Sequence, residues 1–314
     1  MRTRLTDLLN ITFPIIQGAM AWIADAQLAG AISKAGGAGV IAAGGRDPNW
    51  LRDEMHKIKF LTNKPFGVNI VLMDTNKEAL MDVVCEEKAA FVTLSAGNPV
   101  PYIDKFKKEQ IKTFAVVPNA KLAHRLEDVG ADAVIIEGME AGGHIGKLTT
   151  LALMTNVIPE ISIPVIVAGG IADGRGIAAA LLMGASGVQI GSRFLTSEEC
   201  PVHPNFKQRI IDAQDTDSVV TGYFTKHVVR GLRCKFTDKF LKMEREGATV
   251  EEMDRFATGT SRLSAVDGDV ENGMVQVGQS LHPLKSIQPA NEIIHELMCE
   301  TERVLSGAFA LLNA

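Results

Sequence analysis

The sequence predicts an α/β fold in which eight strand–helix units close into a (β/α)8 TIM barrel. Short runs of apolar, often β-branched residues recur about every 25 residues over the first two thirds of the chain. The runs are almost wholly apolar, as is typical of parallel strands covered on both faces. Stretches with the periodicity of helices separate them. Eight such units favour a closed barrel over an open doubly wound sheet, which remains the alternative.

Each expected strand ends in glycine, asparagine or another polar residue. The strands are residues 14–18, 39–44, 66–70, 91–95, 113–117, 133–137, 164–168 and 187–191. The clearest helices between them are residues 25–35, 76–87, 120–129 and 175–183.

The pattern changes after the eighth strand. Residues 196–280 are more charged and lack the strand–helix rhythm, and residues 289–312 have the pattern of a final helix. We therefore expect a barrel of residues 1–195 and 281–314. A small helical cap, residues 196–280, would be inserted after strand eight and would bind substrate.

Composition narrows the functional classes. The 314 residues carry a net charge of −5, which gives no sign of nucleic-acid binding. No apolar run approaches the roughly 18 residues that span a bilayer, and no secretory signal is visible, so we expect a cytoplasmic protein without membrane contact. The four cysteines lie far apart without a CxxC pair, so we expect no metal site.

Glycines follow the seventh and eighth strands, where barrel enzymes commonly bind phosphate. Strand seven is followed by Gly169 and Gly170, and strand eight by Gly191 and Ser192. Backbone N–H groups approach an anion closely at glycine, and the serine adds a hydroxyl donor. The alternative is that these glycines only form turns. Their occurrence after both strands favours a phosphate site.

Other candidate side chains follow the remaining strands. His144 lies among glycines after strand six, where it could donate a hydrogen bond or a proton, or merely cap a backbone group. Asn69 ends strand three, and its amide suits the edge of a planar heterocycle; Gln17 could do likewise. Met20 and Trp22 follow strand one and could pack on a ring or belong to the core.

One stretch of the expected cap is basic. Residues 226–245 contain seven lysines and arginines, including Arg230 and Arg233, but only two acidic residues. This stretch is either a solvated helix face or a docking surface for an anionic partner, such as an acidic carrier protein or a nucleotide phosphate.

Several motifs together resemble a known family over nearly the whole chain. They are FPIIQGAMAWIAD, the GVN of strand three, SAGNP, EGMEAGGHIGKLTT, IPVIVAGGIADG and VQIGSRF. These motifs resemble the FMN-dependent enoyl-acyl carrier protein reductase II, within the nitronate monooxygenase (2-nitropropane dioxygenase-like) superfamily. The opening departs from many members, because Ala19 stands where they have a second glycine. The later segment Val277-Gly278-Gln279 resembles an element that returns toward the flavin.

The resemblance implies an oxidoreductase. NADH or NADPH would reduce FMN, and the flavin would reduce a trans-2-enoyl thioester on acyl carrier protein, in bacterial fatty-acid elongation. The alternative within the superfamily is a nitronate monooxygenase that oxidises nitroalkanes or nitronates with oxygen. A homodimer is also implied. By matching motifs, His144 is the catalytic residue at the thioester. The implied cofactor-binding residues are Gly18, Ala19, Met20, Asn69, Glu137, Gly143, Gly169, Gly170, Gln189, Gly191 and Ser192.

Overall fold

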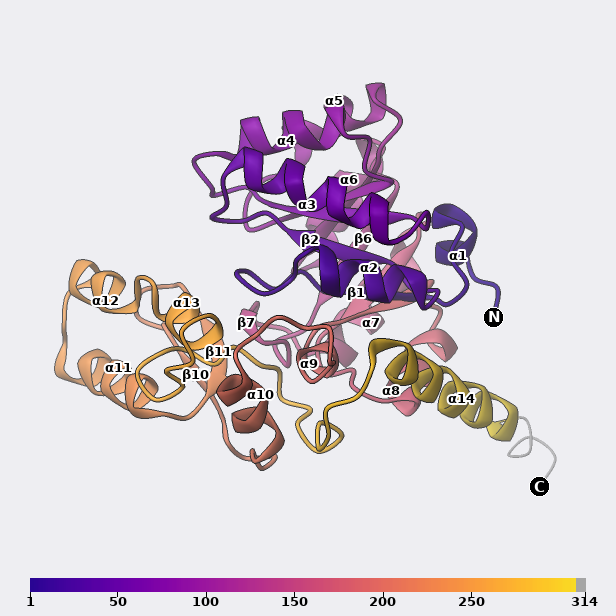
Figure 1. Cartoon of the computed structure of the whole chain (residues 1–314). Helices are drawn as coiled ribbons and strands as arrows, with labels where there is room; N and C mark the ends of the chain where they lie inside the picture. Colours follow the sequence, from indigo (N-terminus) through magenta and orange to yellow (C-terminus); the bar gives the residue numbers. More distant parts are fainter. Residues whose placement is uncertain (309–314) are drawn as a thin grey trace.

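Eight parallel strands surround a central core in the computed structural model, which describes residues 1–308 (Figure 1). Their order in the sheet is β1-β9-β8-β6-β5-β4-β3-β2. Their bounds are β1 (Ile15–Gln17), β2 (Gly39–Ala42), β3 (Phe66–Val71), β4 (Phe91–Ser95), β5 (Lys112–Val117), β6 (Ala133–Glu137), β8 (Val165–Ala168) and β9 (Gly187–Ile190). The eight predicted strands are confirmed, each within a few residues of its expected bounds.

The sheet closes between its first and last strands. Ile16 forms a parallel bridge to Ala38, just before β2. Gln17, which is completely buried, accepts a hydrogen bond of 3.0 Å from the amide of Val40. Its side-chain nitrogen donates to the carbonyl oxygen of Gly18. The side-chain amide of Gln17 therefore joins β1 to the chain at β2. The suggestion that this side chain meets a heterocycle was wrong. The TIM barrel is confirmed.

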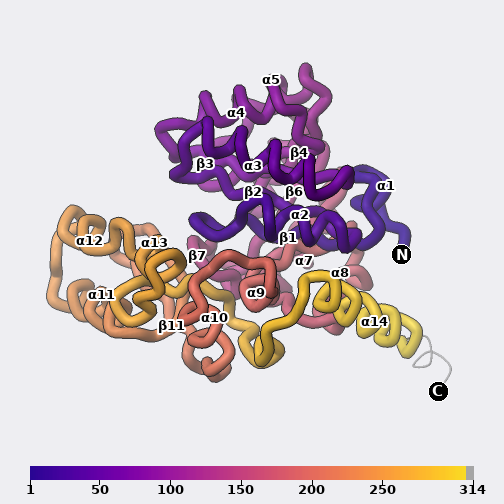
Figure 2. The backbone as a smooth tube through the Cα atoms, viewed as in Figure 1, coloured from indigo at the N-terminus to yellow at the C-terminus, as the bar shows by residue number. Residues whose placement is uncertain are grey.

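Helices cover the outside of the barrel (Figures 1 and 2). They are α2 (Ala26–Lys34), α3 (Pro48–Leu61), α4 (Lys77–Glu86), α5 (Ile103–Lys108), α6 (Ala120–Asp128), α7 (Thr150–Val157), α8 (Gly174–Leu182) and α14 (Ala290–Ala308). The last helix packs against α8, where Thr301 meets Gly174. The predicted final helix is confirmed to residue 308, and residues 309–312 of that prediction lie outside the described residues.

One end of the barrel is plugged by the helix α1 (Arg4–Leu9). Its Leu5 and Leu9 are buried in one cluster with inward-facing strand residues such as Phe91 and Phe114. A Cβ at Gly187, the first residue of β9, would collide with Leu5. Because α1 and the first strand residues fill the amino end, a ligand can approach only the carboxyl end.

The chain between the barrel's eighth strand, β9, and α14 forms a smaller unit at one side of the barrel (Figure 1). It contains α9 (Ser192–Leu195), α10 (Pro204–Ile211), β10 (Ser218–Thr221), β11 (Val229–Leu232), α11 (Lys235–Glu246), α12 (Val250–Ala257) and α13 (Thr260–Ala265). The helices agree with the predicted helical cap, whereas the two strands were not predicted. Within residues 1–308, no helix is long and apolar enough to cross a membrane.

Candidate functional site

Three polar side chains face the barrel interior at the carboxyl ends of its strands. The neighbours of Asn69 on β3 and of Gln189 on β9 pack outward, between sheet and helices. Asn69 and Gln189 therefore point inward, because successive side chains alternate between the two faces. Glu137 lies two residues beyond Ile135, which packs inside the barrel. The fold thus gathers three of the predicted site residues at one mouth.

The loops after β8 and β9 lie side by side, because these strands are paired. Gly169 and Gly170 have φ values of +91° and +74°, which residues other than glycine rarely adopt. The amides of Gly170, Gly191 and Ser192 donate to no protein acceptor among residues 1–308. Neighbouring unpaired amides at glycine are what a phosphate group needs. The geometry therefore fits a phosphate better than turn formation alone.

The loop that follows β6 packs against the β8 loop. The Glu140 carboxylate accepts a hydrogen bond of 3.0 Å from the amide of Thr150. The Thr150 hydroxyl lies 2.9 Å from the carbonyl oxygen of Gly169. A Cβ at Gly169 would lie 2.8 Å from the carbonyl oxygen of Gly138, so only glycine fits between these loops. Glu140 and Thr150 were not among the predicted site residues.

The segment 277–280 returns from the inserted unit to the same loops. The amide of Gly278 donates to the Ser192 hydroxyl over 2.8 Å. The amide of Gln279 donates to the carbonyl oxygen of Glu140 over 2.8 Å. The Ser280 hydroxyl donates to the carbonyl oxygen of Gly170. The expectation that this segment returns toward the predicted site agrees with this placement.

The end of β1 borders the β9 loop. The amide of Gly18 donates to the carbonyl oxygen of Ile190 over 2.8 Å. A Cβ at Gly191 would lie 4.0 Å from the Met20 sulfur. Ala19 and Met20 are both half-buried. The predicted Gly18–Met20 segment therefore lies beside the candidate phosphate loops.

Asn69 is oriented by the neighbouring strand. Its side-chain nitrogen lies 2.9 Å from the Thr93 hydroxyl and 3.2 Å from the Ser95 hydroxyl, both on β4. These contacts fix the plane of the amide at the barrel mouth. Thr93 could have been found from the sequence, because it lies in the strand after Asn69, two residues before a polar strand end.

The carboxyl group of Glu137 has a perturbed acidity. Burial raises its pKa to about 7, and no basic group offsets that shift. At neutral pH a substantial fraction of Glu137 is therefore protonated. A protonated carboxyl can donate a hydrogen bond, which suits the polar atoms of a bound heterocycle.

His144 lies on the short strand β7 (Gly143–His144), which joins the sheet of the inserted unit. There His144 pairs with Val229 and Gly143 pairs with Arg230 of β11. Although the His144 side chain is exposed, the surrounding protein atoms lower its pKa, and His227 lowers it further. The imidazole is therefore neutral at pH 7. His144 therefore lies on a short strand and not in an irregular loop.

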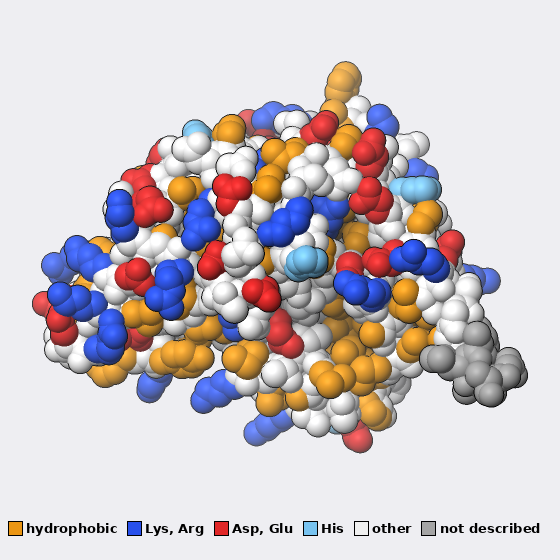
Figure 3. Space-filling view, turned by 90° about the horizontal axis from the view of Figure 1, so that it is seen from below, with side chains coloured by type: hydrophobic (Ala, Val, Ile, Leu, Met, Phe, Trp, Pro, Cys, Tyr) orange, Lys and Arg blue, Asp and Glu red, His pale blue; other side chains and the backbone are white. Residues whose placement is uncertain are grey.

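Residues 226–245 do not form a uniform basic surface. Arg230 is only 5% exposed, and its side chain donates to the carbonyl oxygen of Met139 over 3.0 Å and to the Ser218 hydroxyl. Arg233 is paired with Asp238 at 3.3 Å. Figure 3 shows positive and negative side chains interspersed on the part of the molecule that contains α11 and α12. The interpretation of Arg230 as a docking residue was wrong, because it anchors the loop before His144.

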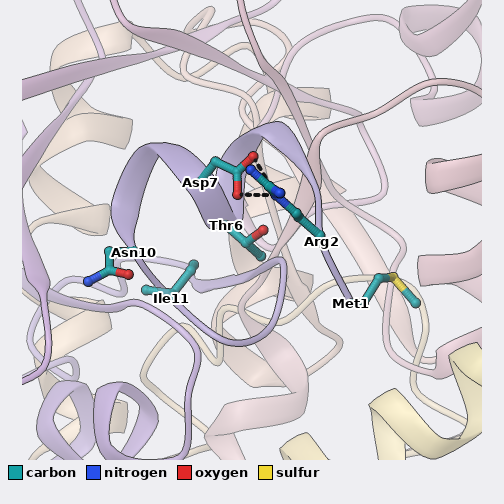
Figure 4. A pocket seen from close by; sticks show the side chains of 6 residues that line it. All are labelled: Met1, Arg2, Thr6, Asp7, Asn10 and Ile11. Atoms are coloured by element: carbon teal, nitrogen blue, oxygen red, sulfur yellow. Dashed lines mark hydrogen bonds and ion pairs between the residues drawn. The ribbon is translucent and has the colours of Figure 1, made fainter.

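A separate hollow of about 540 Å³ lies at the chain's amino end, beside α1 (Figure 4). Its lining includes Arg2 and Asp7, which form an ion pair at 2.9 Å. Because α1 plugs the opposite end of the barrel, this hollow is not part of the candidate site. Among the described residues, no cluster of three histidine, cysteine or acidic side chains could hold a metal ion.

Comparison with known proteins agrees with this geometry. The family model described as nitronate monooxygenase matches residues 2–80 and 75–300. The chain belongs to the nitronate monooxygenase family. This family is flavin-dependent and binds FMN. Membership is consistent with the arrangement of free amides, glycines and inward-facing polar groups at the barrel mouth.

Two branches of the nitronate monooxygenase family appear among the relatives. The structure of FabK from Thermotoga maritima has 44% sequence identity, a TM-score of 0.96 and 99% coverage of both chains. Nitroalkane oxidase from Streptomyces ansochromogenes has 26% identity and a TM-score of 0.86, covering 98% of this chain and all of that one. A probable nitronate monooxygenase from Staphylococcus aureus (strain JH9) is 28% identical, covering 97% of this chain and 98% of the relative.

Proposed function

We propose that the protein is an enoyl-acyl carrier protein reductase that uses NADH or NADPH and FMN. FabK is an enoyl-acyl carrier protein reductase II. The observation that carries this proposal is the 44% identity to FabK over 99% of both chains, against 28% for the nitronate monooxygenase relative. The experiment is anaerobic mixing of NAD(P)H-reduced enzyme with a crotonyl thioester. Rapid reoxidation of the flavin is expected, and a flavin that stays reduced contradicts the proposal.

The barrel mouth fits FMN. The free amides of Gly170, Gly191 and Ser192 would hold its phosphate, while Asn69 and Glu137 would meet the polar edge of the ring system. Gly18, Ala19, Met20, Gly143, Gly169 and Gln189 would complete this binding site. When bound, FMN supplies hydride exchange between the nucleotide and the substrate. Purified protein should show visible flavin absorbance, and colourless protein would point to a flavin-free barrel that binds other phosphorylated ligands.

His144 would act on the thioester. Its lowered pKa leaves a neutral ring whose N–H can donate a hydrogen bond to the thioester oxygen. Negative charge develops on that oxygen when the β-carbon gains hydride, so this hydrogen bond strengthens in the transition state. The pairing of His144 with Val229 fixes the backbone that presents the ring. A neutral imidazole is better suited to stabilising the enolate than to delivering a proton.

The carrier protein is the proposed macromolecular partner, in a cytoplasmic homodimeric enzyme. The exposed side chain of Arg233, within the inserted unit, is the basic group that supports a docking role, whereas buried Arg230 anchors the loop before His144. Charge reversal in Arg233→Glu should therefore raise KM for a carrier-linked enoyl substrate more than for a small thioester. Equal effects on both substrates would argue against docking there. Size-exclusion chromatography with light scattering tests the dimer.

A nitronate monooxygenase is the second candidate. The family model and the Staphylococcus aureus relative favour it. A neutral His144 could then accept a proton from a nitroalkane. Oxygen consumption that depends on added nitronate, together with slow reaction of the reduced enzyme with crotonyl thioester, would support this alternative over the reductase.

A further inference from the structure

The chain contains only two tryptophans, and both lie against one arginine. The guanidinium carbon of Arg46 is 4.5 Å from the ring centroid of Trp22 and 4.4 Å from that of Trp50. Trp22 follows β1, Arg46 follows β2, and Trp50 lies in the first turn of α3. Three separate segments therefore converge to hold one planar cation between two indole rings.

The Nε atom of Arg46 lacks a partner. Among the described residues it is the single buried side-chain nitrogen or oxygen without a hydrogen bond. Burial lowers the pKa of Arg46, although attraction to Glu54 and Asp25 opposes the shift. The guanidinium nevertheless stays charged, because its ordinary pKa is so high. Arg46 as a whole is only half-buried, and within residues 1–308 none of its side-chain nitrogens has a hydrogen-bond acceptor, so the terminal guanidinium nitrogens are free to bind a ligand.

The backbone at Trp22 is also unusual. Its φ is +67°, a conformation that is rare for a bulky residue and often marks a functional site. The conformation follows the turn in which the carbonyl oxygen of Met20 accepts from the amides of Ile23 and Ala24. Met20 borders the candidate phosphate loop at Gly191. The Trp22–Arg46 contact therefore lies beside the proposed flavin site.

A cavity of about 240 Å³ opens at this contact, where the barrel meets the inserted unit. Its walls are Trp22, Ile23, Asp25, Arg46, Trp50, Glu54, Pro201, Ala265 and Val266. Asp25 uses Oδ1 to accept the amides of Gln27 and Leu28, and Glu54 accepts from Ala26 and Lys57. The cavity thus combines aromatic surface, a cationic donor and carboxylates.

These three chemistries match one ligand class. A purine base stacks on aromatic rings, a phosphate pairs with a guanidinium, and ribose hydroxyls donate to carboxylates. Resting on the proposed function, we propose that this cavity binds the adenosine-phosphate part of the reducing nucleotide, with Arg46 holding a phosphate. The nicotinamide end would then extend past Met20 toward the flavin.

The two tryptophans allow a test that is independent of turnover. ADP, which cannot reduce flavin, is titrated into the holoenzyme while intrinsic tryptophan fluorescence is recorded. We expect a saturable change, and binding weaker by about 10- to 100-fold in Arg46→Ala, as loss of a charged hydrogen bond predicts. Arg46→Lys keeps the charge but not the planar guanidinium, so its affinity for ADP should lie between those of the wild type and Arg46→Ala. Arg2→Ala, a charge removed beside α1, is the matched control and should bind normally.

Several results would overturn this assignment. They are the absence of an ADP response, equal ADP affinity in Arg46→Ala and the wild type, or binding of inorganic phosphate as tight as that of ADP. In steady-state assays Arg46→Ala should raise KM for NAD(P)H more than it lowers kcat; a change in kcat alone contradicts the assignment.

Wild-type enzyme reduced with dithionite separates the nucleotide site from the proposed enoyl reductase function. If it fails to reduce a crotonyl thioester while ADP still binds, the proposed function fails and the nucleotide site stands.

Discussion

The Ser192 hydroxyl, at the start of α9, accepts a hydrogen bond of 2.8 Å from the amide of Gly278. This bond joins the loop after β9 to the segment that returns from the inserted unit, 86 residues later in the chain. A Cβ at Gly278 would lie 3.1 Å from the same hydroxyl, so the two backbones approach closely. The return segment therefore rests directly on the loop that would hold the flavin phosphate.

Substitution Ser192→Ala should weaken both stability and flavin binding. It leaves the partly buried Gly278 amide without its acceptor, which costs about 1–3 kcal/mol. Urea denaturation measures the loss, and the fluorescence of released FMN measures the affinity. Thr155→Ala removes a hydroxyl bonded to Leu151 on an exposed helix and should change neither by much. Equal behaviour of the two variants would show that the Ser192–Gly278 bond has no special role.

Substitution His144→Ala should separate catalysis from cofactor binding. Enoyl reduction should fall by about 10²- to 10⁴-fold, because the thioester oxygen loses its donor. FMN content should be unchanged, since the free amides lie on the β8 and β9 loops. His124→Ala, on the exposed side of α6, is the control. Full activity in His144→Ala would remove His144 from the mechanism, and loss of FMN would place it among the cofactor contacts.

Substitution Gly169→Ala should destabilise the protein by about 1–3 kcal/mol. The added Cβ would lie 2.8 Å from the Gly138 carbonyl oxygen, at a residue with a φ of +91°. Gly307→Ala on α14 is the matched control, because its Cβ would meet nothing within 4 Å. That control should be neutral or slightly stabilising, since alanine favours helix. Thermal unfolding of both variants gives the comparison, and similar midpoints would contradict the close loop packing.

The barrel strands could be predicted because each is an apolar run whose two faces are both covered. Strand β4 (Phe91–Ser95) has the predicted bounds. The strands β10 (Ser218–Thr221) and β11 (Val229–Leu232) escaped prediction because only part of each is buried and β11 contains an arginine. Their stability depends on pairing with each other and with β7, which no local pattern reveals.

The candidate site could be predicted where local sequence decides the geometry. Gly169 and Gly191 follow strands in the chain, so their position at the barrel mouth follows from the fold. Arg230 could not be placed this way, since its burial depends on pairing with Gly143, 87 residues earlier. Arg46 and Trp50 were likewise not singled out, because the sequence does not show that Arg46 packs between Trp22 and Trp50.

Glu137 predicts an unusual pH dependence of stability. The unfolded chain releases its proton near pH 4.5, whereas burial raises the folded pKa to about 7. Between these values the folded protein binds more protons, so stability should fall as pH rises, by up to about 3 kcal/mol in the flavin-free protein. Urea denaturation at about pH 5 and about pH 8 measures the difference in the free energy of unfolding. Glu137→Gln should remove this part of the slope, because its amide does not ionise, whereas Glu292→Gln, on exposed surface of α14, should keep it. If the free energy of unfolding depends on pH in the same way in Glu137→Gln and in the wild type, the Glu137 carboxyl is ionised in the folded protein at pH 5. Solvent or a cation would then reach it.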